Sequence, residues 1–141
     1  MSATLEVTAS TRIAAPPEVV FPYFTDPALI CTWLTETADL DPRPGGIFAV
    51  NPGRPAQGTY VAVEPPHRVV FTWGIPDDAT LPPGASTVEV VLAADGDGTV
   101  VTLTHSDLPE DHRPSHQQGW IHFIGLLPGV VESRGCGSEL H

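Results

Sequence analysis

Apolar and polar residues alternate over the first stretch of the chain. Every second position carries a side chain that suits one face of a sheet, in the order Leu5, Val7, Ala9, Thr11 and Ile13, with polar residues between them. A period of two is typical of a β-strand with one face in water. The sequence therefore predicts a first strand over residues 5–13.

Two short helices are predicted next. The first begins at Pro16–Glu18, because proline is tolerated in the first turn of a helix. Pro22 ends it, since a proline inside a helix removes a backbone donor. Asp26–Pro27 then begins a second helical turn, with Asp26 or the threonine before it as the cap, and this turn runs to about Thr32.

From Glu36 onward the pattern is that of β-strands. Short segments rich in β-branched and aromatic residues are separated by Pro, Gly and Asp clusters that form turns. The predicted strands are Thr37–Asp41, Ile47–Val50, Gly58–Glu64, Arg68–Trp73, Ser86–Leu92 and Thr99–His105. Because consecutive strands usually pair with their neighbours, these segments form an antiparallel meander, with one long loop over Ile75–Gly84.

The last apolar stripe has the period of a helix. Four large side chains fall at positions i, i+3, i+4 and i+7, namely Trp120, Phe123, Ile124 and Leu127. The start lies at Pro114 or Ser115. Pro128 would clash with the carbonyl of Ile124, so the helix is expected to stop or kink near Leu127. We expect one domain over residues 1–134 and a frayed tail over 135–141.

This order of elements predicts an α+β fold. A long antiparallel sheet has an apolar face to bury, and the last helix is the element long enough to cover it. A twisted sheet of six to seven strands that curves around this helix leaves a space between them unless large side chains fill it. We expect the functional site in that space.

Composition and charge narrow the range of functions. The chain has 141 residues and a formal charge of −11, and all of its basic residues are arginines. An acidic chain with scattered arginines has no basic stripe for nucleic acid, and the lack of lysine excludes Schiff-base chemistry. Apolar runs stay far below the ~20 residues of a membrane span, and the first residues lack a cationic signal region. We therefore expect a cytoplasmic protein.

The cysteines and histidines form no strong metal or redox motif. Cys31 and Cys136 are isolated from each other, which indicates two reduced thiols, with a bridge between them as the alternative. His105, His112 and His116 together suggest zinc, but a proline lies between the last two, and ligand spacing alone is weak support. We expect neither a metal nor a cofactor.

Several short motifs occur in an order that resembles a known family. They are Arg12–Pro16, Val19–Phe21, Thr25–Pro27, Trp33, Arg43–Gly46, Phe48, Gly58–Tyr60, Glu64–Pro66, Arg68–Trp73, Thr102–His105 and Gly119–Trp120. Over residues 3 to about 127, the chain resembles the activator of heat-shock-90 ATPase homologue-like family, within the START-like (SRPBCC) superfamily. The resemblance implies a helix-grip fold and, for small members, a ligand-binding cavity. Some relatives act as cyclases or toxin-sequestering resistance proteins, and the family has no invariant catalytic set.

His105 is the candidate catalytic residue. Strand alternation groups it with Val101 and Leu103 on the face toward the last helix, where an imidazole can act as a general base. The alternative is a strand-end histidine that is hydrogen-bonded to a loop carbonyl, and structural histidines outnumber catalytic ones. Lysine is absent and Cys31 lies in an apolar setting, so neither competes for the role.

The residues expected to line the space are mostly aromatic or branched. They are Trp33, Phe48, Tyr60, Trp73, Val101, Leu103, His116, Trp120 and Phe123. Aromatic rings in a cavity can stack on an aromatic ligand. The alternative is that these side chains fill the core.

Three functions are consistent with these features. The first is a small soluble protein that binds a hydrophobic or aromatic molecule between the sheet and the C-terminal helix. The second is an enzyme that uses this cavity, such as a cyclase, dehydratase or hydrolase of polyketide-like substrates, with His105 as the base. The third, which the resemblance implies, is a chaperone-regulating interaction module. We expect a monomer or a homodimer, with neither nucleic acid nor a membrane as a partner.

Overall fold

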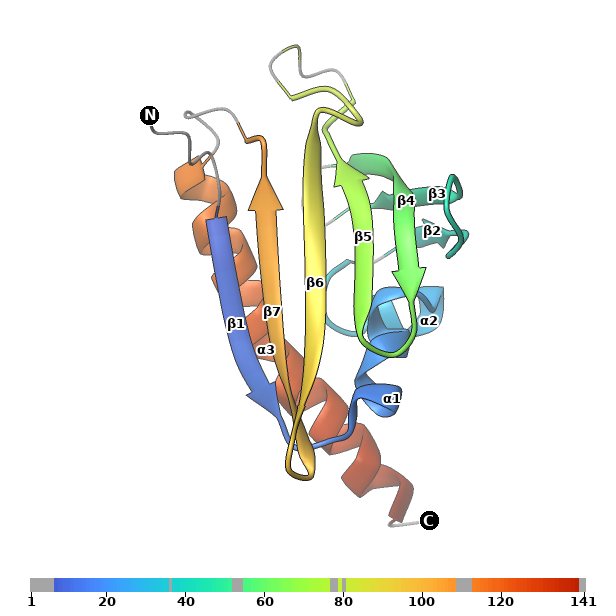
Figure 1. Cartoon of the computed structure of the whole chain (residues 1–141), viewed down its shortest axis with the longest axis vertical. Helices are drawn as coiled ribbons and strands as arrows, with labels where there is room; N and C mark the ends of the chain where they lie inside the picture. The colour runs from blue at the N-terminus through green and yellow to red at the C-terminus, as the bar shows by residue number, and fades with distance from the viewer. Residues whose placement is uncertain are drawn as a thin grey trace.

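In the part of the chain that the structure describes, seven antiparallel strands form one sheet with a long helix across one face (Figure 1). This computed structural model describes residues 7–35, 37–51, 55–76, 79, 81–108 and 113–139, and for Ser115 and residues 133–139 it describes the backbone alone. The strands are β1 (Val7–Ile13), β2 (Ala38–Leu40), β3 (Ile47–Val50), β4 (Ala56–Glu64), β5 (Arg68–Trp73), β6 (Ser86–Asp95) and β7 (Gly98–Ser106). The helices are α1 (Pro17–Val20), the 3-10 helix η1 (Phe21–Phe24), α2 (Pro27–Ile30) and α3 (Arg113–Glu139). The predicted α+β fold, with a curved antiparallel sheet and a C-terminal helix, is confirmed.

The strands follow the order β1-β7-β6-β5-β4-β3-β2. Strands β2 to β7 form the predicted meander, and β1 joins its end by pairing with β7, with Val7 opposite His105 and Ile13 opposite Thr99. The turn between β6 and β7 is tighter than predicted, because β6 runs to Asp95 and β7 begins at Gly98. The sheet is therefore continuous, with β1 at one edge and β2 at the other.

Helix α3 packs on the sheet through one stripe of buried side chains. In Figure 1 it runs obliquely behind the sheet, past β1 and β7. Its buried residues are Trp120, Ile124, Leu127 and Val131. This spacing confirms the predicted stripe and extends it by one turn, while Phe123 is only partly buried.

Side chains of α3 also bind the backbone in β1 and just after it. Gln117 Nε2 donates to the carbonyl oxygen of Thr8 over 2.9 Å. Glu132 Oε2 accepts a hydrogen bond from the backbone N–H of Ala14, also over 2.9 Å. Because β1 is an edge strand, these bonds cover polar groups that would otherwise be free to pair with another chain.

The expectation that α3 stops near Leu127 is wrong. The helix continues through Pro128 to Glu139. Proline removes one backbone hydrogen bond and crowds the carbonyl of Ile124, which costs about 3 kcal/mol in a helix interior. Leu127 and Val131 are both buried on either side of it, so their packing opposes a break at this point.

The short helices before β2 form as predicted. Pro22 lies in η1, where the α-helix gives way to a tighter turn. Asp26 caps α2, since its Oδ1 accepts from the backbone N–H of Ala28 over 2.9 Å. The indole N–H of Trp33 donates to the carbonyl of Tyr23 over 3.0 Å, which ties the end of this segment to its beginning.

Candidate functional site

The ends of three strands meet α3 at one end of the sheet. Trp73 ends β5 and is the register partner of Ser86, which begins β6. His105 lies near the end of β7, opposite Val88 of β6. Trp120 of α3 packs against them, with its ring centroid 5.2 Å from that of Trp73 and 6.0 Å from that of His105. Trp73, Ser86, His105 and Trp120 are all buried, and we call them the tryptophan–histidine cluster.

A directed chain of hydrogen bonds runs through this cluster. The Trp120 indole can only donate, and its Nε1 lies 2.9 Å from Nδ1 of His105, so Nδ1 accepts. The proton of the neutral ring is then on Nε2, which donates to Ser86 Oγ over 2.8 Å. Ser86 Oγ in turn donates to the carbonyl oxygen of Trp73 over 2.6 Å. Both ring nitrogens of His105 are thus occupied by protein groups.

The surroundings of His105 favour its neutral form. Burial lowers its pKa from 6.5 to about 3, and the charge of His116 acts in the same direction. The two imidazole rings meet edge to face, with centroids 5.2 Å apart. Protonation of Nδ1 would also remove the acceptor for Trp120. At neutral pH His105 is therefore an uncharged ring in a fixed orientation.

This geometry bears on the role predicted for His105. Strand alternation does place it with Val101 and Leu103, and all three side chains are fully buried. A general base needs a free lone pair, and the Nδ1 lone pair accepts the hydrogen bond from Trp120. The arrangement favours the structural alternative, but the partners are Ser86 and Trp120 instead of the expected loop carbonyl.

A row of aromatic rings continues from the cluster across the sheet. The Trp73 ring lies 6.1 Å from that of Phe48, which stacks on Phe71 with 3.9 Å between centroids. Tyr60 meets Phe48 edge to face at 5.6 Å, and its hydroxyl donates to the carbonyl of Phe24 over 2.9 Å. Burial, followed by the charge of Asp41, raises the pKa of Tyr60, so the phenol stays protonated. Along this row, the aromatic rings pack on one another on the inward face of the sheet.

The structure places most of the predicted lining residues in the interior. Seven are buried, namely Trp33, Phe48, Tyr60, Trp73, Val101, Leu103 and Trp120. Phe123 and His116 are half-buried on α3. Trp33 lies apart from the cluster, because it packs on Phe24 and bonds to Tyr23 in the layer of short helices.

Sequence reasoning missed Ser86 and Phe71. Ser86 occupies the first inward position of β6, ahead of Val88 and Val90, and both valines are fully buried. A serine at an inward position of an otherwise apolar strand face was the available signal, because a buried hydroxyl must find partners. Phe71 lies two residues before Trp73 in β5, and the alternation of a strand puts both side chains on one face, which was the available signal.

One buried donor in this row has no acceptor among the described residues. It is the indole N–H of Trp73, although the whole side chain is only 5% exposed. The indoles of Trp33 and Trp120 both donate to protein acceptors. The polar groups next to Trp73 are already committed, since its own carbonyl and the ring of His105 both bond to Ser86.

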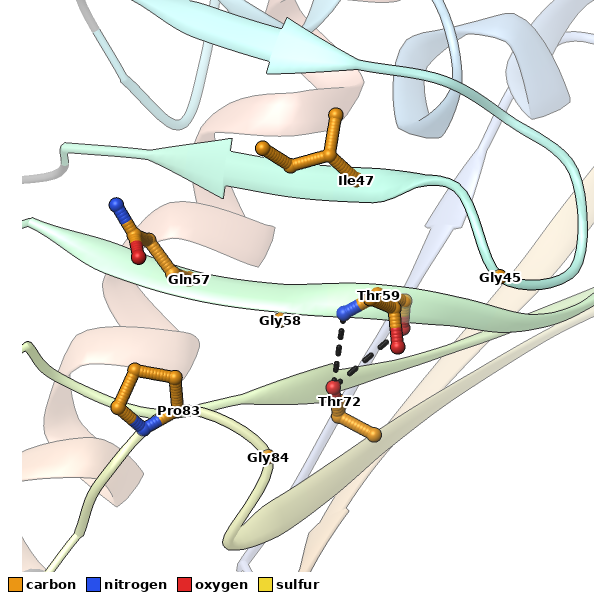
Figure 2. A pocket seen from close by; sticks show the side chains of 8 residues that line it. All are labelled: Gly45, Ile47, Gln57, Gly58, Thr59, Thr72, Pro83 and Gly84. Atoms are coloured by element: carbon orange, nitrogen blue, oxygen red, sulfur yellow. Dashed lines mark hydrogen bonds between the residues drawn. The ribbon is translucent and has the colours of Figure 1, made fainter.

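A separate surface pocket lies over β3, β4 and β5. It has a volume of about 400 Å3 and is lined by Gly45, Ile47, Gln57, Gly58, Thr59, Thr72, Pro83 and Gly84 (Figure 2). Thr72 projects away from α3, because its neighbours Phe71 and Trp73 project inward, and its Oγ1 accepts from the backbone N–H of Thr59 over 2.9 Å. None of the nine predicted lining residues borders this pocket or the neighbouring one of about 220 Å3 over β2 and β3.

Other predicted chemistry can be compared with the described residues. They contain no group of three His, Cys, Asp or Glu side chains placed to hold a metal ion, and His112 lies outside them. Cys31 is a half-buried free thiol, and the side chain of Cys136 lies outside the description. No helix in the described part of the chain has the length and apolar character needed to cross a bilayer.

Solved structures share this fold over nearly the whole chain. The solution structure of an AHSA1-like protein from Rhizobium etli is 37% identical, with a TM-score of 0.70, and the match covers 93% of this chain and 86% of that one. A crystal structure of a protein from Mesorhizobium loti is 26% identical with a TM-score of 0.79 and covers 91% and 97%. An HSP90 activator from Plasmodium falciparum, 23% identical over 91% and 96% with a TM-score of 0.75, shows a likeness of fold alone.

The family assignment comes from the sequence itself. A search of curated proteins gave no significant match. The sequence profile described as "Activator of Hsp90 ATPase homolog 1-like protein" matches residues 14–132, which include every strand from β2 to β7 and most of α3. The chain therefore belongs to the Activator of Hsp90 ATPase homolog 1-like family.

Proposed function

We propose that this protein binds a small hydrophobic or aromatic molecule between the sheet and α3, beside the tryptophan–histidine cluster. The observation that carries the proposal is the buried indole N–H of Trp73, which has no acceptor among the described residues. Leaving a buried donor without a partner costs about 1–3 kcal/mol. A bound molecule with an acceptor atom would recover that free energy, and the surrounding rings of Trp120 and Phe48 offer it aromatic faces.

Entry of such a molecule requires some movement of α3, since rings already occupy the row next to the sheet. The helix contains Pro128 and, on either side of it, Gly125 and Gly129. A Cβ atom added at either glycine would meet no atom within 4 Å apart from the neighbouring backbone of the helix itself, so packing does not require glycine at these positions. Glycine and proline have the two lowest helix propensities, so this part of α3 is easier to displace.

Binding can be tested without knowing the natural ligand. Native mass spectrometry of freshly purified protein would show a co-purified small molecule as an added mass. Titration with Nile red, a neutral apolar dye, should show uptake of about one dye per chain, while the side-chain NMR signals stay sharp. A protein that carries no added mass and takes up neither Nile red nor any dye of a wider apolar panel has a filled interior, and the proposal fails.

An enzyme that uses the same space is the alternative for His105. Such an enzyme must first free Nδ1 from Trp120, for example when a substrate displaces α3. A co-purified molecule would supply the candidate substrate class. Chemical conversion of that molecule by the wild-type protein but not by His105→Gln would then favour the enzyme over the binding protein.

Regulation of a chaperone ATPase, which the family's description names, is the weaker alternative. Docking on a large partner needs a contiguous surface. The exposed large hydrophobic side chains of the described residues are instead distributed over α1, β3, β4, β6 and α3, and they are Val19, Ile47, Val61, Val91, Ile121 and Leu126. We further propose that the protein is cytoplasmic and is a monomer or a homodimer. We also propose that it binds neither nucleic acid nor membranes, because its net charge of −11 repels both polyanions and acidic lipid surfaces.

A further inference from the structure

We infer that the ligand of this site is a neutral aromatic molecule whose carbonyl-type oxygen accepts a hydrogen bond from Trp73 Nε1. This inference rests on the proposed function and specifies the chemistry of its ligand. Three features carry it: the uncommitted donor, the committed state of the polar groups around it, and the absence of charge on the buried side chains of the described residues.

The donor is specific to Trp73. All three tryptophans of the chain are at least 95% buried, and the indole N–H groups of Trp33 and Trp120 donate to protein acceptors. Around Trp73, the ring of His105 accepts from Trp120 and donates to Ser86. The site can therefore offer Trp73 as a donor to a ligand but has no free acceptor in this cluster, which favours a ligand with an acceptor atom there.

The lack of charge limits what that acceptor can be. Among the described residues, the buried polar side chains are Thr35, Ser86, Thr99 and His105, and none of them is charged at neutral pH. Arg43 and Arg68 each bind a carboxylate at the surface, Asp41 and Glu89 respectively. A ligand carboxylate beside Trp73 would meet the rings of Phe48, Trp120 and neutral His105, none of which is a cation. A ketone, quinone or amide oxygen therefore fits better than an acid at this position.

The ring contacts define the rest of the ligand. Trp120, His105 and Phe48 approach Trp73 with centroid separations between 5.2 and 6.1 Å. Rings at such separations pack edge-on or offset, and a planar aromatic molecule can join them by the same kind of contact. The inferred ligand thus has a flat apolar body and one acceptor oxygen at its edge.

A matched pair of probes tests the inference. 1-Indanone and indane share one bicyclic skeleton, but only the ketone carries an acceptor. Affinities of both are measured by NMR titration for wild type, for Trp73→Phe and for Trp33→Phe. The ketone-to-hydrocarbon affinity ratio should fall roughly 2- to 10-fold in Trp73→Phe, the scale of one net hydrogen bond, and should stay unchanged in Trp33→Phe. Indane-1-carboxylate should bind at least 10-fold more weakly than the ketone.

The results separate this inference from the proposed function. If neither neutral probe binds to wild type, the proposed site fails. If both bind but the ratio is the same in wild type and Trp73→Phe, the site stands and the inferred hydrogen bond is wrong, as it would be if a buried water already satisfied Trp73. If indane-1-carboxylate binds as tightly as 1-indanone, the inference that the ligand is neutral is wrong. Should Trp73→Phe not fold, the wild-type Trp73 indole proton decides: it must shift downfield with 1-indanone and not with indane.

Discussion

The indole of Trp120 donates to Nδ1 of His105 over 2.9 Å, and this contact sets the tautomer of a histidine that lies between the sheet and α3. Apolar contacts between a helix and a sheet specify little about rotation or register, because they have no direction. A hydrogen bond has a direction and fixes both. From His105 the chain of hydrogen bonds continues through Ser86 to the backbone carbonyl of Trp73. The network therefore links α3 to three neighbouring strands and holds the N-terminal half of the helix in one position.

The first prediction concerns acid. The pKa of His105 is about 3 in the folded protein and near 6.5 in the unfolded chain, so below pH 6.5 the unfolded state binds a proton that the folded state does not. The contribution of neutral His105 is complete above that pH and is lost as the pH falls toward 3. Urea unfolding of wild type and His105→Gln should give a difference in free energy that is flat above pH 7 and shrinks by up to about 1.4 kcal/mol per pH unit below 6. An unchanged difference down to pH 4 would show that His105 is not held neutral.

NMR gives an independent check on the same group. The ring signals of His105 should stay constant between pH 5 and pH 8, because its pKa lies below this range. A titration with a midpoint near 6.5 would mean that the side chain is exposed to solvent. Both the cavity role and the structural role of His105 would then be wrong.

The second prediction concerns Ser86. Ser86→Ala removes the hydroxyl that bonds to the Trp73 carbonyl, and it leaves the buried Nε2 of His105 without its acceptor. It should destabilise the fold by about 1–3 kcal/mol. Ser106→Ala is the matched control, because its hydroxyl is only partly buried and makes one long bond of 3.4 Å to Thr87. Urea unfolding measures the loss of stability in both variants. Equal losses would show that the chain of hydrogen bonds through Ser86 does not stabilise the protein.

The sequence predicted the elements whose signals are local. Alternation over Ser86–Leu92 and Thr99–His105 reports which side chains share a face, and turn residues mark where strands end, so the meander could be read directly. Pro128 shows the limit of a local rule. Its effect on a free helix is unfavourable, but α3 continues because Leu127 and Val131 are buried around it, and that burial is a property of the whole fold.

The candidate site was predictable in outline only. Period two placed His105 inward, and Trp73 was expected either to line the space or to fill the core; both side chains are buried. The tautomer of His105 and the unpaired N–H of Trp73 depend on how three strands and a helix position single atoms. Residues far apart in sequence, such as Ser86 and Trp120, decide those contacts, and no pattern along the chain reports their distances.

The third prediction tests the stripe of α3. Leu127 is fully buried, whereas its neighbour Leu126 is 43% exposed. Leu127→Ala should cost about 2–5 kcal/mol, since it removes buried methyl groups and leaves a cavity, while Leu126→Ala should cost less than about 1 kcal/mol. Urea unfolding of both variants gives the comparison. Similar values would mean that this part of α3 does not pack on the sheet as described.

The last prediction concerns the glycines of α3. Gly125→Ala and Gly129→Ala add a methyl group that meets no atom within 4 Å apart from the neighbouring backbone of the helix, and alanine has the higher helix propensity. Each should therefore stabilise the protein by about 0.5–1 kcal/mol. Gly58→Ala is the opposite case, because a Cβ there would collide with the carbonyl of Thr72, and it should destabilise the sheet.

These glycine variants also bear on binding. If α3 must move to admit a ligand, a stiffer helix should slow the uptake of Nile red more than it changes the equilibrium affinity, since affinity differences from helix propensity are small. Stopped-flow mixing of the dye with wild type, Gly125→Ala and Gly129→Ala measures this directly. Stabilised variants that take up the dye at the wild-type rate would show that entry does not depend on this part of α3. The path would then lie elsewhere between the sheet and the helices.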